Sequence, residues 1–135
     1  MGRLSVAASI AAALAVLGPA CGKDSTGAGA GVEAIVGAWK AKGLEPSAFV
    51  PSPEVKLDGA RCRAGTISGL DATLCEFADE AAARKAEPAG RALVGETTGA
   101  AIASGRLLLV VADRRSADPN GRRINEITKT FRGIR

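Results

Sequence analysis

The chain has 135 residues, of which 47% are apolar, 24% charged and 3% aromatic, and its formal net charge is +4. An apolar fraction this high at so modest a charge excludes a wholly disordered chain and predicts one small domain with a buried core. Because the sequence has no histidine, it excludes chemistry that needs an imidazole: Ser/His/Asp and Cys/His catalysis, histidine zinc sites and histidine pH switches.

Residues 1–20 have the pattern of an export signal. Arg3 gives a positive start, and a stretch of uncharged, mostly apolar residues follows from position 4 to 17. A membrane-spanning helix needs about 18 or more apolar residues, whereas the apolar part of a signal peptide needs roughly 7 to 15. Pro19 disfavours helix at Gly18 and leaves the segment before Ala20 extended for a peptidase. We therefore predict a signal peptide that is cleaved before Cys21.

This segment resembles the precursor of a bacterial lipoprotein, in which a cysteine directly after the apolar stretch receives a diacylglyceryl group and becomes the new N-terminus. The resemblance covers residues 1–21 and implies lipidation of Cys21 and a membrane anchor in the cell envelope. In such lipoproteins an Asp directly after the cysteine signals retention in the inner membrane. Because Gly22 stands there, the resemblance implies the periplasmic side of the outer membrane. Plain secretion after the same cut and a cytosolic location are the alternatives.

The cysteine count agrees with an anchor at Cys21. Three cysteines in an exported protein leave one over, and lipidation of Cys21 leaves Cys62 and Cys75 to pair. If Ser68 and Gly69 form a two-residue turn, these cysteines lie directly opposite each other at a non-hydrogen-bonded pair, with Cα atoms about 4.5 to 5.5 Å apart. That separation suits a disulfide. Two reduced core cysteines are the alternative.

The body begins after a flexible segment. Residues 22–31, GKDSTGAGAG, are too small and polar to pack and predict a tether, so the folded domain spans 32–135. Apolar residues at helical spacing predict a helix over 32–42, which ends with Gly43 in a left-handed conformation and Leu44 against Trp39, as in a Schellman motif. Three prolines and no period predict a surface loop over 45–59. Four apolar side chains are expected to pin this loop to the body: Phe49, Val50, Val55 and Leu57.

Two similar units follow the loop. The first is a hairpin over 61–77, after which Asp79 caps a helix over 80–87 that Pro88 and Gly90 end. The first unit places Ile67, Leu70, Ala72 and Leu74 on its core face.

The second unit has arms at 98–103 and 106–113 around a turn at Ser104 and Gly105. Its alanine-rich first arm suits a helix as well as a strand. Asp118 and Pro119 then open a final helix as N-cap and N1, with Ile124, Ile127 and Phe131 on its core face. We predict an α+β fold: an N-terminal helix, then two hairpin-plus-helix units that form a four-stranded antiparallel sheet packed on helices.

The unbroken apolar run Leu107 to Val111 needs cover on both faces. The N-terminal helix or the proline-rich loop is one candidate for the second face. A partner protein, a second copy of the chain, an apolar ligand or a membrane surface is the other.

Basic residues gather in the last 22 positions, and four of them are candidates for an anion patch: Arg114, Arg115, Arg122 and Lys129. The alternative is that these basic residues only form the solvent-exposed face of the final helix and bind no anion. Nucleic acid is disfavoured as a partner by the export signal and by the lack of interleaved aromatic residues.

Catalytic and metal-binding patterns are weak in this sequence. Four acidic residues near predicted strand ends are candidates for an acid/base pair: Glu76, Asp79, Glu80 and Asp113. We find no spacing typical of a metal or cofactor site. The sequence therefore predicts a lipid-anchored envelope protein that is a small binding or structural module and not an enzyme. A small exported enzyme that uses carboxylates and a carrier of apolar ligands are the alternatives.

Overall fold

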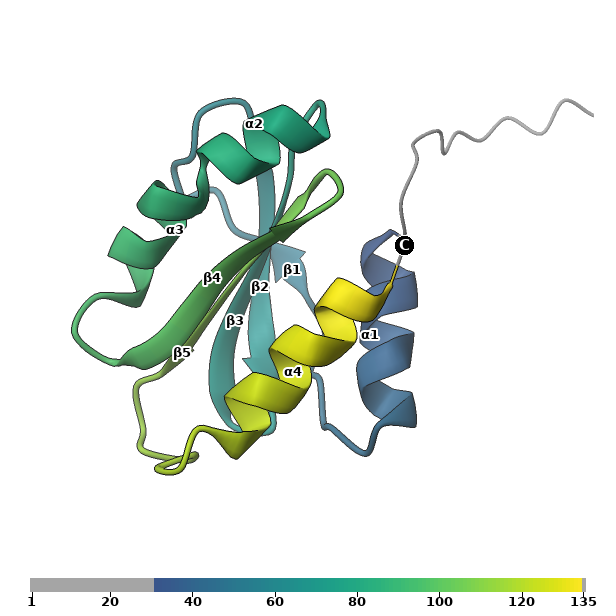
Figure 1. The fold of residues 1–135 in the computed structure, drawn as a ribbon, viewed down its shortest axis with the longest axis vertical. Helices are drawn as coiled ribbons and strands as arrows, with labels where there is room; N and C mark the ends of the chain where they lie inside the picture. Colours follow the sequence, from purple (N-terminus) through teal and green to yellow (C-terminus); the bar gives the residue numbers. More distant parts are fainter. Residues whose placement is uncertain (1–30, 135) are drawn as a thin grey trace, which may run out of the picture.

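The computed structural model describes residues 31–134, which form a five-stranded antiparallel sheet with helices on both faces (Figure 1). The strands lie in the order β1-β2-β3-β5-β4 across the sheet. The elements in chain order are α1 (Val32–Ala41), β1 (Val50–Pro51), β2 (Arg61–Ile67), β3 (Leu70–Glu76), α2 (Glu80–Lys85), α3 (Glu87–Val94), β4 (Thr98–Ser104), β5 (Leu107–Asp113) and α4 (Arg122–Gly133). The predicted α+β class and antiparallel sheet are confirmed. The predicted signal peptide, Cys21 and residues 22–30 of the predicted tether lie outside the described residues.

Helices α1 and α4 cover one face of the sheet, and α2 and α3 cover the other. Because side chains alternate between the two faces of a strand, the apolar run of β5 divides between two cores. Leu107, Leu109 and Val111 pack under α1 and α4, and Leu108 and Val110 pack under α2 and α3. All five are at most 5% exposed. The chain itself thus covers both faces of this run, and a partner at these side chains, which stays a prediction, would have to displace a helix.

Helix α1 ends as its sequence predicts. Gly43 has a φ of 79°, in the left-handed region that glycine adopts without a Cβ clash. The N–H of Leu44 donates to the carbonyl oxygen of Trp39, and the N–H of Gly43 donates to that of Lys40, each at 3.0 Å. These two bonds define the Schellman motif, and Leu44 packs in the same core as Trp39.

The predicted loop 45–59 contains the fifth strand, β1, which the four-strand prediction lacks. Val50 lies opposite Ala64 of β2, and Pro51 lies opposite Arg63. Proline has no N–H for a ladder, so it fits an edge strand as short as this one. Val50 was predicted to hold this loop against the body, but it is 57% exposed, so that prediction is wrong. The other three predicted pins do pack on the cores: Phe49, Val55 and Leu57.

The β2–β3 hairpin has the predicted register. Ser68 and Gly69 have φ values of 50° and 85°, as a type I′ turn requires, and Ile67 lies opposite Leu70. The predicted core face is confirmed, because Ile67, Leu70, Ala72 and Leu74 all lie in the core under α1 and α4.

The β4–β5 hairpin turns one residue later than predicted. The first arm is a strand, Thr98–Ser104, which settles the choice between helix and strand. Ser104 lies opposite Leu107, so the turn consists of Gly105 and Arg106 rather than Ser104 and Gly105. In this turn only Gly105 has a positive φ, of 56°, as in a type II′ turn that begins with glycine. Ser104 is therefore free to stay in the strand.

The predicted helix 80–87 is two helices. Asp79 caps α2 as expected, since its Oδ1 accepts a 2.8 Å hydrogen bond from the N–H of Ala82. Pro88 does not end a helix but lies in the first turn of α3, where its missing N–H costs nothing. Gly90 lies inside α3, where an added Cβ would be 3.1 Å from the Ala101 Cβ and the Leu108 Cδ2. Glycine here lets the helix approach the sheet closely.

Helix α4 begins later than predicted. Its N-cap is Gly121, with a φ of 68°, and its first residue is Arg122, so Asp118 and Pro119 are not the N-cap and N1. Asp118 nevertheless satisfies a helix donor, because its Oδ2 accepts a 2.9 Å hydrogen bond from the N–H of Ile124. The predicted core face is confirmed, with Ile124, Ile127 and Phe131 buried.

Candidate functional site

A disulfide joins β2 to β3 at the predicted pair. Cys62 lies directly opposite Cys75, with Cα atoms 4.0 Å apart, and their Sγ atoms are bonded. Cys75 is fully buried in the core under α2 and α3, whereas Cys62 is half-buried near the edge of the sheet. The disulfide uses two of the three cysteines of the chain, and the predicted lipidation site Cys21 lies outside the described residues.

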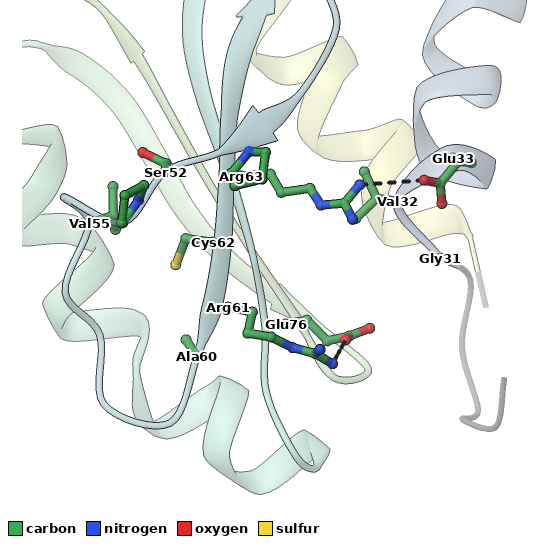
Figure 2. A pocket seen from close by; sticks show the side chains of 12 residues that line it. Gly31, Val32, Glu33, Ser52, Val55, Ala60, Arg61, Cys62, Arg63 and Glu76 are labelled. Atoms are coloured by element: carbon green, nitrogen blue, oxygen red, sulfur yellow. Dashed lines mark hydrogen bonds and ion pairs between the residues drawn. The ribbon is translucent and has the colours of Figure 1, made fainter. Parts of the chain in front are cut away.

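A basin of about 610 Å³ opens at this edge of the sheet, beside the start of α1 (Figure 2). Its lining comes from three places: the start of α1, the loop that contains β1, and the ends of β2 and β3. These residues are Gly31, Val32, Glu33, Pro51, Ser52, Pro53, Val55, Ala60, Arg61, Cys62, Arg63 and Glu76. The volume is in the range of small-ligand sites, and its walls combine apolar and charged side chains.

The charged side chains of the basin pair with one another. Arg61 lies 3.1 Å from Glu76, and Arg63 lies 3.5 Å from Glu33 (Figure 2). The side chains of Arg61 and Glu33 are 89% and 84% exposed. Because exposed ion pairs contribute little to stability, a ligand can replace these partners at small cost. The rim of the basin thus offers two guanidinium groups and two carboxylates.

Ser52 orders one wall of the basin. It is 3% exposed, and its N–H donates a 2.9 Å hydrogen bond to the carbonyl oxygen of Cys62. Its hydroxyl donates to a carboxylate oxygen of Glu54, and this bond lowers the pKa of Glu54 below its ordinary value. A carboxylate with a lowered pKa is a weaker base, so this pair holds the loop in place rather than activating the hydroxyl.

The four candidate carboxylates have separate partners. Glu76 pairs with Arg61 and Arg106, Asp79 caps α2, and Glu80 pairs with Arg84. Asp113 lies at the other end of the sheet from Glu76. Since Glu76 lies opposite Leu107, the six steps along β5 from Leu107 to Asp113 separate these two carboxylates by about 20 Å. Over residues 31–134 no group of three or more His, Cys, Asp or Glu side chains is arranged to hold a metal ion.

Asp113 instead organises the loop between β5 and α4, a role that was not predicted from the sequence. Its two carboxylate oxygens accept hydrogen bonds from the N–H groups of Ala117 at 2.8 Å and Asp118 at 2.9 Å. The Asp118 N–H, followed by Ala117 and Arg115, lowers the pKa of Asp113 against the opposing effect of burial. Two aspartates five positions apart after a buried strand are the only trace of this arrangement in the sequence.

The candidate anion patch divides between two settings. Arg114 donates a 2.7 Å hydrogen bond to the carbonyl oxygen of Leu93 at the end of α3. Arg115 donates to the carbonyl oxygen of Gly69 at 3.0 Å and to a carboxylate oxygen of Asp71 at 2.9 Å. The other two members, Arg122 and Lys129, are exposed on α4. Half of the candidate set thus makes contacts within the chain, and anion binding stays a prediction.

Arg123, which is outside the predicted set, shares the turn with Arg115. It donates a 3.3 Å hydrogen bond to the carbonyl oxygen of Ser68. The β2–β3 turn is therefore held from the α4 side by two guanidinium groups on successive carbonyl oxygens.

No family model matches this chain, and no curated protein or solved structure is similar enough to count as a relative. In the part of the chain that the structure describes, no helix has the length and hydropathy to span a membrane.

Proposed function

We propose that this chain is an exported, lipid-anchored protein of the bacterial cell envelope, and that its folded body is a small binding module. The disulfide between Cys62 and Cys75 is the observation that carries this proposal. Structural disulfides persist in oxidising compartments, outside the cytosol. With these two cysteines paired, Cys21 is the odd cysteine, at the position where the lipoprotein-like leader ends.

The basin at the β1–β2 edge is the proposed binding surface. Gly31 lines it, and Gly31 is only ten positions after Cys21 in the sequence. Ten residues span at most about 35 Å when fully extended. A lipid at Cys21 would therefore keep the basin close to the membrane surface, on the periplasmic side of the outer membrane in our proposal.

The composition of the basin favours binding of a polar or zwitterionic ligand. Val32, Val55 and Ala60 give it apolar walls, and exposed ion pairs form its rim. Apolar walls with a few charged groups are typical of binding sites. The charged rim makes this basin unsuited to a carrier of purely apolar ligands.

Intact mass of the protein purified from membranes, measured with and without reductant, tests the anchor and the disulfide together. We expect a chain that begins at Cys21, carries added acyl mass and gains the mass of two hydrogen atoms on reduction. The control variant Cys21→Ser is expected to lack the acyl mass and to keep the disulfide. A full-length chain in the cell interior with three titratable thiols would contradict the proposal.

Photocrosslinking in intact cells tests the basin separately. A photoreactive residue at Arg61, whose side chain is 89% exposed on the rim, is expected to capture an envelope component. The same residue at Glu126, which is exposed on α4, is the matched control and is expected to capture none. Equal capture at both positions would show that the basin has no special role.

A further inference from the structure

Strand β4 forms the outer edge of the sheet, because β5 is its only neighbour among residues 31–134. Figure 1 views the molecule from this side, with β4 in front, α3 on one side of it and α4 on the other. The strand spans seven residues, TGAAIAS, from Thr98 to Ser104. One long edge of its backbone is therefore turned away from the rest of the described chain.

The hairpin register identifies the groups on this edge. In a two-residue hairpin the pair next to the turn is hydrogen-bonded, and bonded and non-bonded pairs then alternate. Ser104 closes the turn opposite Leu107, so Gly99, Ala101 and Ala103 direct their N–H and C=O groups outward. Within residues 31–134 none of these three N–H groups has a hydrogen-bond partner. Three donors and three acceptors alternate along the edge.

Strand β4 lacks the charges, prolines and bulges that protect many edge strands from pairing. Natural edge strands are short or carry charges, prolines or bulges. The opposite edge of the same sheet, β1, has two residues and includes Pro51. By contrast, β4 has no charged residue and no proline, and it pairs with β5 at every position from Thr98 to Ser104.

We propose that β4 pairs antiparallel with β4 of a second copy of this chain, around a two-fold axis at Ala101. In this register Ala101 lies opposite Ala101 of the second copy, and Gly99 lies opposite its Ala103. Every outward N–H then donates to an outward carbonyl oxygen, and the two sheets become one continuous sheet. Ala100 of each copy packs beside Ile102 of the other, and both side chains are only half-buried in the isolated chain.

A second copy fits this edge for two reasons. The outward groups are placed symmetrically about Ala101, so the strand is complementary to itself in the antiparallel sense. Glycine and alanine offer no side-chain pocket to select a foreign peptide, whereas strand-binding domains gain specificity from such pockets. Because Pro51 and the shortness of β1 block the other edge, the pairing closes at two copies and does not extend into a fibre.

Cysteine crosslinking tests the two-fold axis. Opposite residues of a hydrogen-bonded pair have Cα atoms about 5.5 Å apart, a separation that a short thiol-reactive crosslinker spans. The variant Ala101→Cys is therefore expected to form a covalent dimer that links position 101 to itself. In Ala103→Cys, the matched control with the same thiols, the two new cysteines are about 13 Å apart along the strands, so no such link is expected. Equal linkage in both variants, or no 101–101 link in a folded Ala101→Cys protein, would overturn the proposal.

Ala101 is only 8% exposed, so the Ala101→Cys variant can fail to fold. The wild-type protein supplies a second test that does not depend on this variant. Sedimentation of the wild-type protein is expected to show a dimer. Hydrogen exchange is expected to show slow exchange at the amides of Gly99, Ala101 and Ala103, and this protection should be lost on dilution. Ala103→Pro, which removes one outward N–H per copy, is expected to weaken the dimer about thirtyfold, while Ala103→Ser leaves it unchanged. A monomer at high concentration, or protection of these amides in a monomer, would overturn the proposal. Neither test depends on the lipid at Cys21.

Discussion

The indole Nε1 of Trp39 donates a hydrogen bond of 3.1 Å to the carbonyl oxygen of Ile127, which lies 88 residues further along the chain. This bond joins α1 to α4 inside the core that covers one face of the sheet. Both side chains are fully buried, and the ring of Phe49 stacks on the indole with centroids 6.0 Å apart. Because a buried N–H without a partner costs about 1–3 kcal/mol, this contact orients the first helix on the last.

Replacing this indole is expected to loosen the packing of α1. Trp39→Phe removes the hydrogen bond and leaves a cavity, so the free energy of unfolding should fall by about 2–4 kcal/mol. Urea unfolding followed by circular dichroism measures this change, because Trp39 is the only tryptophan and the variant loses its fluorescence. The control Phe49→Leu keeps the hydrogen bond and is expected to cost less. A loss below about 1 kcal/mol in Trp39→Phe would contradict the role of the indole.

Removal of the disulfide is expected to destabilise the fold without changing the register of the hairpin. The two cysteines are 13 residues apart in sequence. Closing a loop of this size stabilises a chain by about 3 kcal/mol in the chain-entropy model. The double variant Cys62→Ala/Cys75→Ala should therefore unfold at a lower denaturant concentration than the oxidised protein. Reductant should lower the midpoint of the wild type and leave that of the double variant unchanged; an equal effect on both would mean that the disulfide is not the cause.

The loop before α4 is expected to make stability depend on pH. The pKa of Asp113 is lowered in the folded chain, chiefly by the Asp118 N–H, so its carboxylate binds protons less readily than in the unfolded chain. At pH values above the ordinary pKa of aspartate, this carboxylate therefore stabilises the fold. The stabilisation is lost as the pH falls below about 5 and through the lowered pKa of Asp113. The melting temperature of Asp113→Asn should be lower than that of the wild type near neutral pH, and it should change less as the pH falls into the acid range. Asp58→Asn, an exposed control, should follow the wild-type profile.

Two glycines are expected to respond oppositely to alanine. At Gly99 an added Cβ would meet the carbonyl oxygen of Val111 and lie 2.6 Å from the Cγ1 of Val94, so the backbone must move. Gly99→Ala should therefore destabilise the protein by about 1–3 kcal/mol. Gly37 lies on the exposed side of α1 with nothing within 4 Å of the new atom, so Gly37→Ala should stabilise it by about 0.5–1 kcal/mol. Thermal unfolding of both variants checks the opposite signs.

The sequence alone predicts those features that depend on a few neighbouring residues. Ser68 and Gly69 are enough to set the β2–β3 register, and the register places Cys62 opposite Cys75. Gly43 likewise ends α1, because its φ of 79° suits glycine and its hydrogen bonds reach back only a few positions. In each case the deciding atoms belong to one turn, so local geometry suffices.

The basin and the edges of the sheet could not be predicted in this way. A two-residue strand such as β1 has no period, and only its pairing with β2 makes it a strand. Gly90 resembles a helix terminator in the sequence, yet the approach of α3 to Ala101 and Leu108 places it inside a helix.

What the amino-acid order determined by itself is the pairing of two cysteines, the class of the fold and the leader pattern that predicts export. Tertiary structure decided where the last helix starts, because the carboxylates of Asp113 and Asp118 bind backbone N–H groups only after the strand and the helix have packed together. It also decided that β4 lies at the edge, since β4 has no charge or proline that would mark an edge strand, and only the pairing of β3 with β5 leaves it outermost.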